Sequence, residues 1–232
     1  MTVGVCIVSY QRAALTRRCI ESVRVAATLP YRIFLVDNGS PDCETRSLLT
    51  DMGGSGDVSL TRLERNLGPA AARNLVIRTL PGEVRYVAMF DNDIVALPGW
   101  DEAARKALDA GADLIQPKLL KADGHTLERG PNRPNASALA ANPQFVGSGL
   151  PVDHPEVNRE EEAAIVGGTG VFRRKVFDRI GLLDERLHVG EDFEFSFRAR
   201  AAGFSLRYAP NCALIHDHGF DLAYDQERAR TA

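Results

Sequence analysis

Two short acidic motifs contain the residues of this chain that are best suited to chemistry. Asp91-Asn92-Asp93 directly follows an apolar run from Tyr86 to Phe90, and Glu191-Asp192 opens a predicted helix later in the chain. In an extended segment the side chains at positions i and i+2 point the same way, so we expect Asp91 and Asp93 to face one ligand. Oxygen ligands suit hard divalent cations such as Mg²⁺ or Mn²⁺. The motifs therefore predict a metal-held ligand at a strand end, with Asp192 as a separate general base.

Both motifs also have a purely structural interpretation. Aspartate and asparagine are common in turns because their side chains hydrogen-bond the nearby backbone, and this accounts equally well for residues 91–93. Acidic residues in the first turn of a helix gain up to about 1 kcal/mol from the helix dipole, which accounts for Glu191 and Asp192. The motifs taken singly leave both interpretations open.

Three other features could contribute to a site. His216 and His218 follow a short predicted strand and would place both rings on one side for a metal, although a strand-end histidine more often bonds to backbone. Arg73 is predicted in the first turn of a helix, where the dipole disfavours a cation, so it indicates either an anionic or planar partner or an ordinary surface arginine. Gly167-Gly168-Thr169-Gly170 interrupts an apolar strand and indicates close approach by a ligand, or a bulge.

The composition is that of an ordinary soluble globular protein. The chain has 232 residues, of which 44% are hydrophobic and 25% charged, and this length fits one large α/β domain. The formal net charge is −3 and the pI is near 6.0, so there is no basic field to attract nucleic acid. We therefore expect acidic substrates to be bound locally, by a metal ion or by single arginines.

The cysteines and apolar segments indicate a cytoplasmic protein. Four cysteines lack metal or redox spacing, and Cys6 and Cys19 fall in patterns typical of buried, reduced thiols. A strand predicted from Val3 leaves no room for a signal peptide, and no apolar stretch approaches the roughly 20 residues of a membrane span. We expect no transmembrane segment; peripheral attachment to the inner face of a membrane through a partner is an alternative.

Strands and helices alternate over the first half of the chain. Apolar runs predict strands, and apolar residues four apart, as at Leu15, Cys19 and Val23, predict helices. The predicted strands cover 3–9, 32–37, 58–63, 84–90 and 112–116, and the predicted helices cover 12–28, 68–80 and 101–110. This rhythm predicts a single α/β domain with a mostly parallel, Rossmann-like central sheet flanked by helices.

The rhythm breaks between Lys121 and Glu162, a stretch rich in Pro, Asn, Gly and charge that predicts a long functional loop. Beyond it we expect a strand over 164–172, a helix ended by Gly181, a helix over 191–202, and strands over 204–208 and 213–216. The chain is thus divided into a first half (1–120) that contains the Asp91–Asp93 strand, a loop insertion (121–163), a second half (164–220) that carries Asp192, and a polar tail (221–232).

The order of these motifs resembles that of the family 2 nucleotide-sugar glycosyltransferases, which have the GT-A fold and include bacterial rhamnosyltransferase-like enzymes. Val8-Ser9-Tyr10-Gln11-Arg12 is similar to the family's V-[ST]-Y-N-R, with Gln11 in place of the usual Asn. The other matches are Val36–Ser40 with V-D-[ND]-G-S, Asn66–Asn74 with N-x-G-x-[AGS]-x-A-R-N, Phe90–Asp93 with D-x-D, Gly190–Glu194 with E-D-x-D, and Ile215-His216 with a late histidine. The matching motifs run from Val5 to about Gly219, nearly the whole chain.

The resemblance implies transfer of a hexosyl or deoxyhexosyl group from a nucleoside diphosphate sugar to a hydroxyl of a carbohydrate, lipid-linked or small-molecule acceptor, with inversion. It implies Mn²⁺ or Mg²⁺ on Asp93 and His216, and Asp192 as the catalytic base, while Glu194 departs from the second aspartate of E-D-x-D. The implied donor-binding residues are Ser9, Tyr10, Asp37, Asn66, Arg73 and Asp91. Gly168 and Glu191 are assigned to the acceptor side. A homodimer is one assembly that such a chain could form.

Other classes of protein fit less well. A sugar-nucleotidyltransferase needs a glycine-rich basic loop after the first strand, and Ser9 to Ala13 contains no glycine. A haloacid-dehalogenase-type phosphatase would carry D-x-D at its first strand, and a dinucleotide oxidoreductase would carry G-x-G-x-x-G after Ile7. A non-catalytic nucleotide-sugar-binding protein remains an alternative, which turnover of a donor would distinguish.

Overall fold

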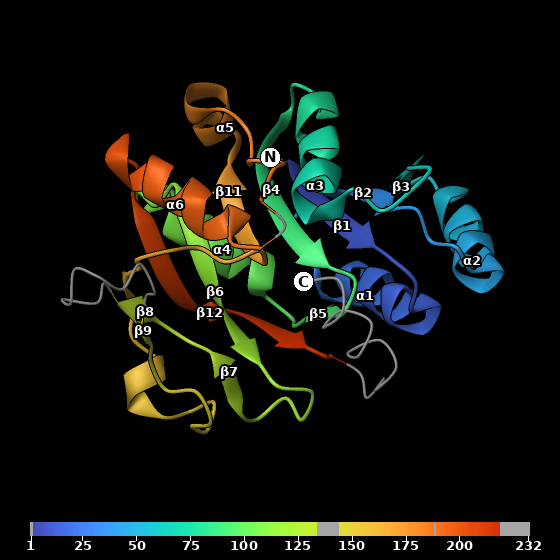
Figure 1. Cartoon of the computed structure of the whole chain (residues 1–232). Coiled ribbons are helices and arrows are strands. Elements are labelled where there is room, and N and C mark those ends of the chain that lie inside the picture. Colours follow the sequence, from blue (N-terminus) through green and yellow to red (C-terminus); the bar gives the residue numbers. More distant parts are fainter. Residues whose placement is uncertain (1, 134–143, 188, 219–232) are drawn as a thin grey trace.

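A computed structural model describes residues 2–133, 144–187 and 189–218 (Figure 1). Its main sheet has the strand order β10-β12-β6-β11-β4-β1-β2-β3, with β5 beside β12 and β7 beside β6. The strands are β1 (Thr2–Ser9), β2 (Tyr31–Asp37), β3 (Val58–Arg62), β4 (Val84–Asp91), β5 (Ile94–Ala96), β6 (Leu114–Leu120), β7 (Leu127–Arg129), β10 (Glu161–Glu162), β11 (Gly170–Arg173) and β12 (Leu206–His216). Strands β3, β2, β1 and β4 are parallel, as are β6 and β12, whereas β11 runs antiparallel between β4 and β6.

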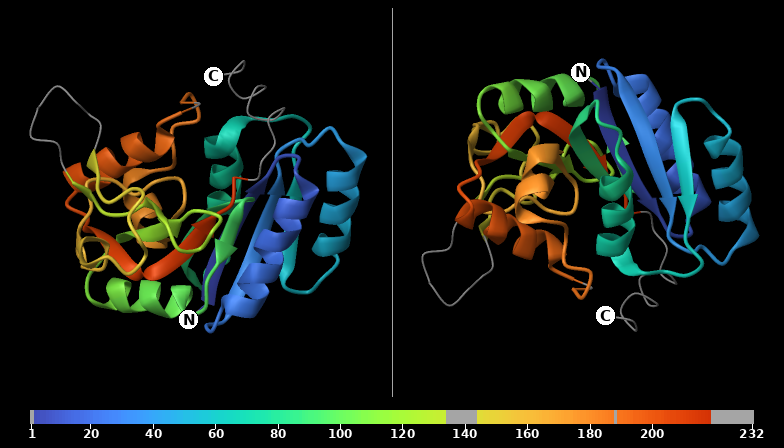
Figure 2. Two further views of the ribbon diagram at one scale, coloured as in Figure 1. Left: turned by 90° about the horizontal axis from the view of Figure 1, so that it is seen from below. Right: turned by 90° about the horizontal axis from the view of Figure 1, so that it is seen from above.

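Helices cover both faces of this sheet (Figure 2). One face carries α1 (Ala13–Ala26), α2 (Cys43–Gly53) and α4 (Trp100–Asp109), and the other carries α3 (Gly68–Thr79), α5 (Arg174–Ile180) and α6 (Glu191–Ala201). Each face has its own core, because alternate strand residues point to opposite sides: Val5 and Ile7 pack with the first group, and Cys6 with the second. The predicted α/β fold is confirmed, and Cys6 and Cys19 are buried free thiols as expected.

Several elements differ from the sequence expectation, among them the unpredicted strand β5. Helix α2 was not predicted, because only Leu48 and Leu49 form its buried apolar stripe; Asp42 caps it by accepting a 2.7 Å hydrogen bond from Thr45 N. The two predicted C-terminal strands form one strand, β12, whose pairing with β6 shifts register between Ala209 and Ala213. The strand predicted over 164–172 begins only at Gly170.

The stretch predicted as a loop contains short elements that are tied to the sheet. Strand β7 pairs with β6, β10 pairs with β12, a small pair is formed by β8 (Asn132–Arg133) and β9 (Gln144–Phe145), and a 3₁₀ helix spans Pro155–Val157. Two buried side chains of the sheet hydrogen-bond to this stretch: Tyr208 donates from its hydroxyl to Val157 O at 2.9 Å, and Lys118 Nζ donates to Val152 O at 3.2 Å. Residues 134–143 of this stretch lie outside the described part of the chain.

The parallel strands bring three predicted site residues to one edge of the sheet. Ser9 on β1 lies in register with Asp37 on β2, and its neighbour Val8 lies in register with Asp91 on β4. Parallel strands that are paired in this way end at the same edge, which is where α/β sheets bind ligands. None of the helices in the described ranges combines the length and apolar character that a membrane crossing requires.

Candidate active site

Arg73 is a buried cation between two carboxylates from distant parts of the chain. Its side chain is 3% exposed; Nη2 donates to Asp91 Oδ1 at 2.6 Å and Nη1 donates to Glu191 Oε1 at 3.0 Å. Helix α3 begins at Gly68, so Arg73 lies in the second turn, not in the first turn that the sequence predicted. The anionic partner indicated by the sequence is thus provided within the protein, where Arg73 joins the end of β4 to the start of α6.

Asp192 is held in place by backbone N–H groups. Its Oδ2 accepts a 2.8 Å hydrogen bond from Gly168 N, and its Oδ1 accepts a 2.9 Å bond from Phe193 N. A Cβ on Gly168 would lie 2.9 Å from Nη2 of Arg73, closer than real contacts allow. Gly168 therefore touches both Asp192 and Arg73, and any side chain at this position would displace the Arg73 guanidinium.

The segment 163–169 is irregular and buried, and polar side chains satisfy its backbone. Asn132 bonds to both N and O of Ile165, the hydroxyl of Ser196 bonds to N and O of Val166, and Gln116 Oε1 accepts from Gly167 N at 2.9 Å. These bonds replace the strand pairing predicted for this stretch and hold Gly168 at its position. Sequence reasoning missed the role of Gln116; the available signal was an amide within a mainly apolar run.

A second cluster forms around His216, at the end of β12. Strand pairing sets His216 opposite Ile94, next to Asp93, and Asp217 N donates to Asp93 O at 2.8 Å. Nε2 of His216 lies 3.4 Å from Asp93 Oδ1, and the rings of His216 and His218 lie 3.7 Å apart between centroids. Glu128 on β7 completes the cluster. The two rings therefore lie together, as the H-x-H spacing predicted.

The segment that joins Asp91 and Asp93 is not extended, contrary to the sequence prediction. The chain leaves β4 at Asp91 and turns at Asn92-Asp93 before entering β5. Because this stretch is not extended, the carboxylates have separate partners: Asp91 contacts Arg73, whereas Asp93 contacts His216 and, at 3.6 Å, Arg12.

Asp93 and Glu128 lie on either side of His216 and determine the charge of its imidazole. Burial lowers the pKa of His216, but its contacts with Asp93 and Glu128 outweigh burial and raise that pKa to about 9. Burial raises the pKa of Glu128, and its hydrogen bonds with His216 and His218 bring it down to about 2. The cluster therefore favours positive charge at its centre.

The donor set of this cluster fits a divalent cation. Asp93, His216 and His218 each offer one ligand atom, and these atoms lie within 4.8 Å of one another. Oδ1 of Asp93 is buried, and among the described residues its 3.4 Å contact with Nε2 of His216 is an ion pair without hydrogen-bond geometry, so its lone pairs can still bind a cation. Of the two cations, Mn²⁺ fits a site with two imidazoles better than Mg²⁺ does, because Mg²⁺ is bound in proteins almost entirely by oxygen ligands.

Three of the predicted donor residues have their side chains engaged within the protein at the strand ends. Ser9 is fully buried and its hydroxyl lies 2.9 Å from that of Thr16. Asp37 Oδ1 accepts from Ser40 N at 2.9 Å, and Asn66 Oδ1 accepts from Asn38 Nδ2 and Gly68 N, each at 2.9 Å. Their side chains thus stabilise the loops beside the site.

The loop after β1 has an unusual backbone. Tyr10 is half-buried at the end of β1, and the next two residues, Gln11 and Arg12, both have positive φ, at 54° and 57°. Non-glycine residues rarely adopt this conformation, and it is concentrated at functional sites. Here it directs the chain from β1 into α1 and brings Arg12 near Asp93.

Sequence reasoning missed the residues of β7. Glu128 contacts both histidines, and Arg129 points toward the base: a Cβ on Gly167 would lie 3.5 Å from Arg129 Nη1 and 3.7 Å from Asp192 Oδ2. The Arg129 side chain is 42% exposed. No motif marked these residues, because β7 lies in the polar stretch that was predicted to be a loop.

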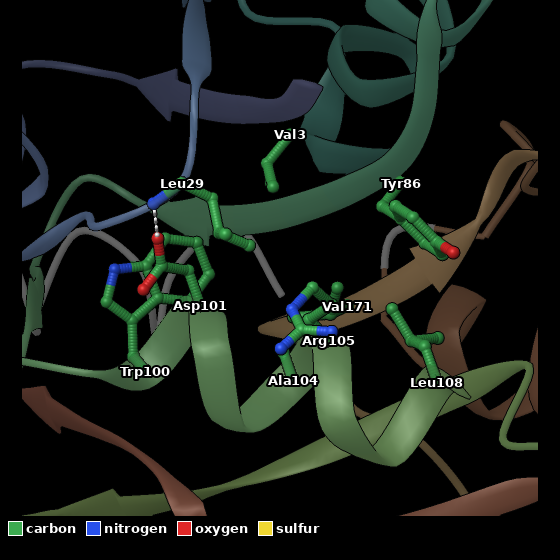
Figure 3. Close-up of a pocket in the computed structure, with 9 residues that line it drawn as sticks. All are labelled: Val3, Leu29, Tyr86, Trp100, Asp101, Ala104, Arg105, Leu108 and Val171. Atoms are coloured by element: carbon green, nitrogen blue, oxygen red, sulfur yellow. Dashed lines mark hydrogen bonds between the residues drawn. The ribbon is translucent and has the colours of Figure 1, made fainter. Parts of the chain in front are cut away.

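A small void between α4 and the sheet is separate from these clusters (Figure 3). Its volume is about 10 Å³, with Trp100 and Leu108 of α4 on one side and Val3, Tyr86 and Val171 of the strands on the other. At its edge, buried Asp101 accepts hydrogen bonds from the backbone N–H groups of Thr28 and Leu29, each at 2.7 Å. This void is a packing defect of the core, because it has room for at most about one water molecule.

Comparisons with known proteins identify the family of the chain. Residues 4–181 match the profile of Glycosyl transferase family 2, and residues 152–230 match that of Glycosyl transferase family group 2. The pre-mycofactocin glycosyltransferase of Mycobacterium tuberculosis is 31% identical over 211 residues, which cover 89% of this chain and 40% of that protein. The uncharacterized glycosyltransferase YwdF of Bacillus subtilis is 24% identical over 230 residues, covering 99% of this chain and 78% of that protein.

The fold has counterparts among solved structures. A crystal structure of GalNAc-T7 with UDP, GalNAc and Mn²⁺ aligns with a TM-score of 0.73 and 18% identity, covering 95% of this chain and 44% of that one. This likeness shows a GT-A-like α/β fold. The chain spans less than half the length of the mycobacterial relative. With its profile match over residues 4–181, the chain belongs to glycosyl transferase family 2.

Proposed function

We propose that this chain transfers a hexosyl or deoxyhexosyl group from a nucleoside diphosphate sugar to an acceptor hydroxyl, with inversion and with the help of a divalent cation. The observation that carries the proposal is a continuous path of contacts between two chemically different groups. Asp93, in the His216 cluster, is two residues from Asp91; Arg73 bonds to Asp91; and Gly168 touches both Arg73 and Asp192. A candidate cation site and a candidate base thus lie at the same end of the sheet.

The similar proteins support the same reaction class. The mycobacterial relative is named as a glycosyltransferase, and the GalNAc-T7 structure contains a nucleoside diphosphate, a sugar and Mn²⁺. This chain matches only part of either protein, so we propose its activity and its substrates rather than take them from these relatives.

Each part of the site has a role in the proposed mechanism. Asp93, His216 and His218 would hold Mn²⁺ or Mg²⁺; when bound, such a cation neutralises charge on the departing diphosphate as a Lewis acid. Asp192 accepts the proton of the acceptor hydroxyl while the oxygen forms its bond to the anomeric carbon and the bond to the diphosphate breaks on the opposite face. General base catalysis of this kind contributes roughly 10²–10⁴ in rate.

We assign donor binding to the first half (1–120) and acceptor binding to the second half (164–220). Asp37 and Tyr10 would lie nearest the nucleobase and Asp91 nearest the ribose, with Ser9 and Asn66 shaping the loops around them. Arg73 serves to position Asp91 rather than to contact the base, because its guanidinium is already occupied by two carboxylates.

The remaining assignments concern the acceptor and the diphosphate. Gly168 and Glu191 line the acceptor side, and Arg129 supplies an exposed cation near Asp192 for the diphosphate. The insertion (121–163) would exclude water from the bound donor, which limits hydrolysis. The acceptor is a carbohydrate, a lipid-linked sugar or a small molecule.

A thermal-shift panel tests the donor class and the metal together. UDP, GDP, dTDP and CMP are each added with and without Mn²⁺, and we expect one nucleoside diphosphate to raise the melting temperature only when Mn²⁺ is present. The corresponding nucleotide sugar should then release nucleoside diphosphate when acceptor is supplied. Binding of the nucleotide sugar without any turnover would instead indicate a non-catalytic binding protein.

A further inference from the structure

Glu128 lies outside every motif described above, yet it contacts both histidines of the cluster. Its Oε1 lies 2.8 Å from Nδ1 of His216 and 3.2 Å from Nε2 of His218, and its side chain is 17% exposed. A histidine that binds a metal must be neutral, with one N–H and one lone pair, so a ring that donates its N–H to a carboxylate presents its other nitrogen to the metal. For His216 that other nitrogen is Nε2, which faces Asp93 at 3.4 Å.

The local backbone explains why Glu128 reaches the histidines. On β7, Leu127 pairs with Leu120 and Arg129 pairs with Leu119, so Glu128 is an extra residue with no partner of its own on β6. This is the pattern of a β-bulge, which redirects a side chain and is common beside active sites. Leu120 in turn pairs with Ile215 on β12, which places the bulge one strand away from His216.

We propose that Glu128 is the positioning residue of the candidate metal cluster: it accepts one N–H from each histidine and thereby fixes His216 with Nε2 turned toward Asp93. The proposal rests on the metal dependence put forward above and extends it to a residue of the insertion. Such carboxylate–histidine pairs raise the basicity of a ligand histidine, and losing the carboxylate typically costs 10–100-fold in metal affinity.

The test is a titration with Mn²⁺ alone, followed by the loss of the electron paramagnetic resonance signal of free Mn²⁺. Glu128→Gln keeps the size of the side chain but removes its charge. The matched control is Glu161→Gln in the same insertion, because Glu161 is also partly buried and ion-paired, at 2.9 Å, with Arg133. We expect the Kd for Mn²⁺ to rise about 10–100-fold in Glu128→Gln and to stay at the wild-type value in Glu161→Gln.

Folding is monitored separately by thermal unfolding in EDTA. If Glu128→Gln fails to unfold cooperatively, Glu128→Asp replaces it; this variant keeps the charge but withdraws the oxygen by one methylene, and it should also bind Mn²⁺ more weakly than the wild type.

Equal Mn²⁺ affinity in the wild type and in the folded Glu128 variant would overturn the inference, and so would a wild-type chain that binds no Mn²⁺. The titration involves no sugar donor. Weakened Mn²⁺ binding together with no donor turnover by the wild type would therefore leave the role of Glu128 intact and reject the proposed transferase function.

Discussion

The N–H of Gly168 donates a 2.8 Å hydrogen bond to Oδ2 of Asp192, and the absence of a side chain on Gly168 leaves the space that Nη2 of Arg73 occupies. Gly168 thus aligns Asp192, the candidate base, and leaves room for the guanidinium of Arg73, which bridges Asp91 and Glu191. The position of Asp192 therefore depends on the backbone of the irregular segment 163–169 and, through Arg73, on helix α3 in the other half of the chain.

Replacing Gly168 with alanine should damage the chemical step more than substrate binding. The new Cβ would lie 2.9 Å from the Arg73 guanidinium, so either Arg73 or the segment that aligns Asp192 must move. A misplacement of about 1 Å can cost on the order of 10²-fold in rate. Steady-state kinetics should show a large fall in kcat with little change in the KM for the donor. Gly82→Ala is the control, because a Cβ there meets nothing within 4 Å; equal kcat values in the two variants would count against this role.

Replacing Arg73 with methionine should destabilise the fold. It leaves Glu191 buried without a cation, and breaking a buried pair by removing one partner typically costs about 3–5 kcal/mol. The control on the same helix is Arg78→Met, which removes an exposed pair with Glu185 and should cost less than about 1 kcal/mol. Urea unfolding of both variants measures the difference, and similar losses would contradict the structural role given to Arg73.

The stability of Arg73→Met should also depend on pH. Burial raises the pKa of Glu191, although Arg73 opposes that shift, so removing Arg73 should raise it further. Between the lower pKa of Glu191 in the unfolded chain and its higher pKa in the folded variant, Glu191 is protonated only in the folded state. The free energy of unfolding should therefore fall as pH rises through that interval. The stability deficit of Arg73→Met should therefore be smaller at pH 5 than at pH 8. A deficit that grows toward low pH would show that Glu191 is not the unpaired group.

Replacing Asp93 with alanine should abolish the effect of Mn²⁺ on nucleotide binding. Asp93 contributes the carboxylate of the candidate metal cluster, whereas Asp57 pairs with Arg24 and provides a control as Asp57→Ala. Calorimetry with the nucleotide selected by the thermal-shift panel should show Mn²⁺-dependent affinity in the wild type and in Asp57→Ala but not in Asp93→Ala. Undiminished Mn²⁺ dependence in Asp93→Ala would remove this residue from the metal site.

The sequence predicted those parts of the fold that depend on local pattern. The apolar runs at 3–9, 32–37 and 84–90 became β1, β2 and β4, and parallel pairing then brought Ser9, Asp37 and Asp91 to one edge of the sheet. The order of the motifs also predicted the family, to which the profile match assigns the chain.

What the sequence could not predict depends on contacts between distant residues. Asp91 and Asp93 have different partners because the chain turns at Asn92, and no local pattern identifies Arg73 or His216 as those partners. Glu128 acquires its contacts from a one-residue bulge in a stretch with no apolar periodicity. The sequence placed Gly168 in a glycine-rich interruption and on the acceptor side, but it could not show the bond to Asp192, which joins residues from two separate elements.

The most direct test of the proposed mechanism is the rate of sugar transfer by Asp192→Asn. Asparagine keeps an oxygen that can accept from Gly168 N but cannot take up a proton as a base. Once a donor and an acceptor are known, we predict that nucleotide affinity in the presence of Mn²⁺ stays at the wild-type value while transfer falls by at least about 10². Transfer near the wild-type rate would contradict the account, because Asp192 would then not be the base.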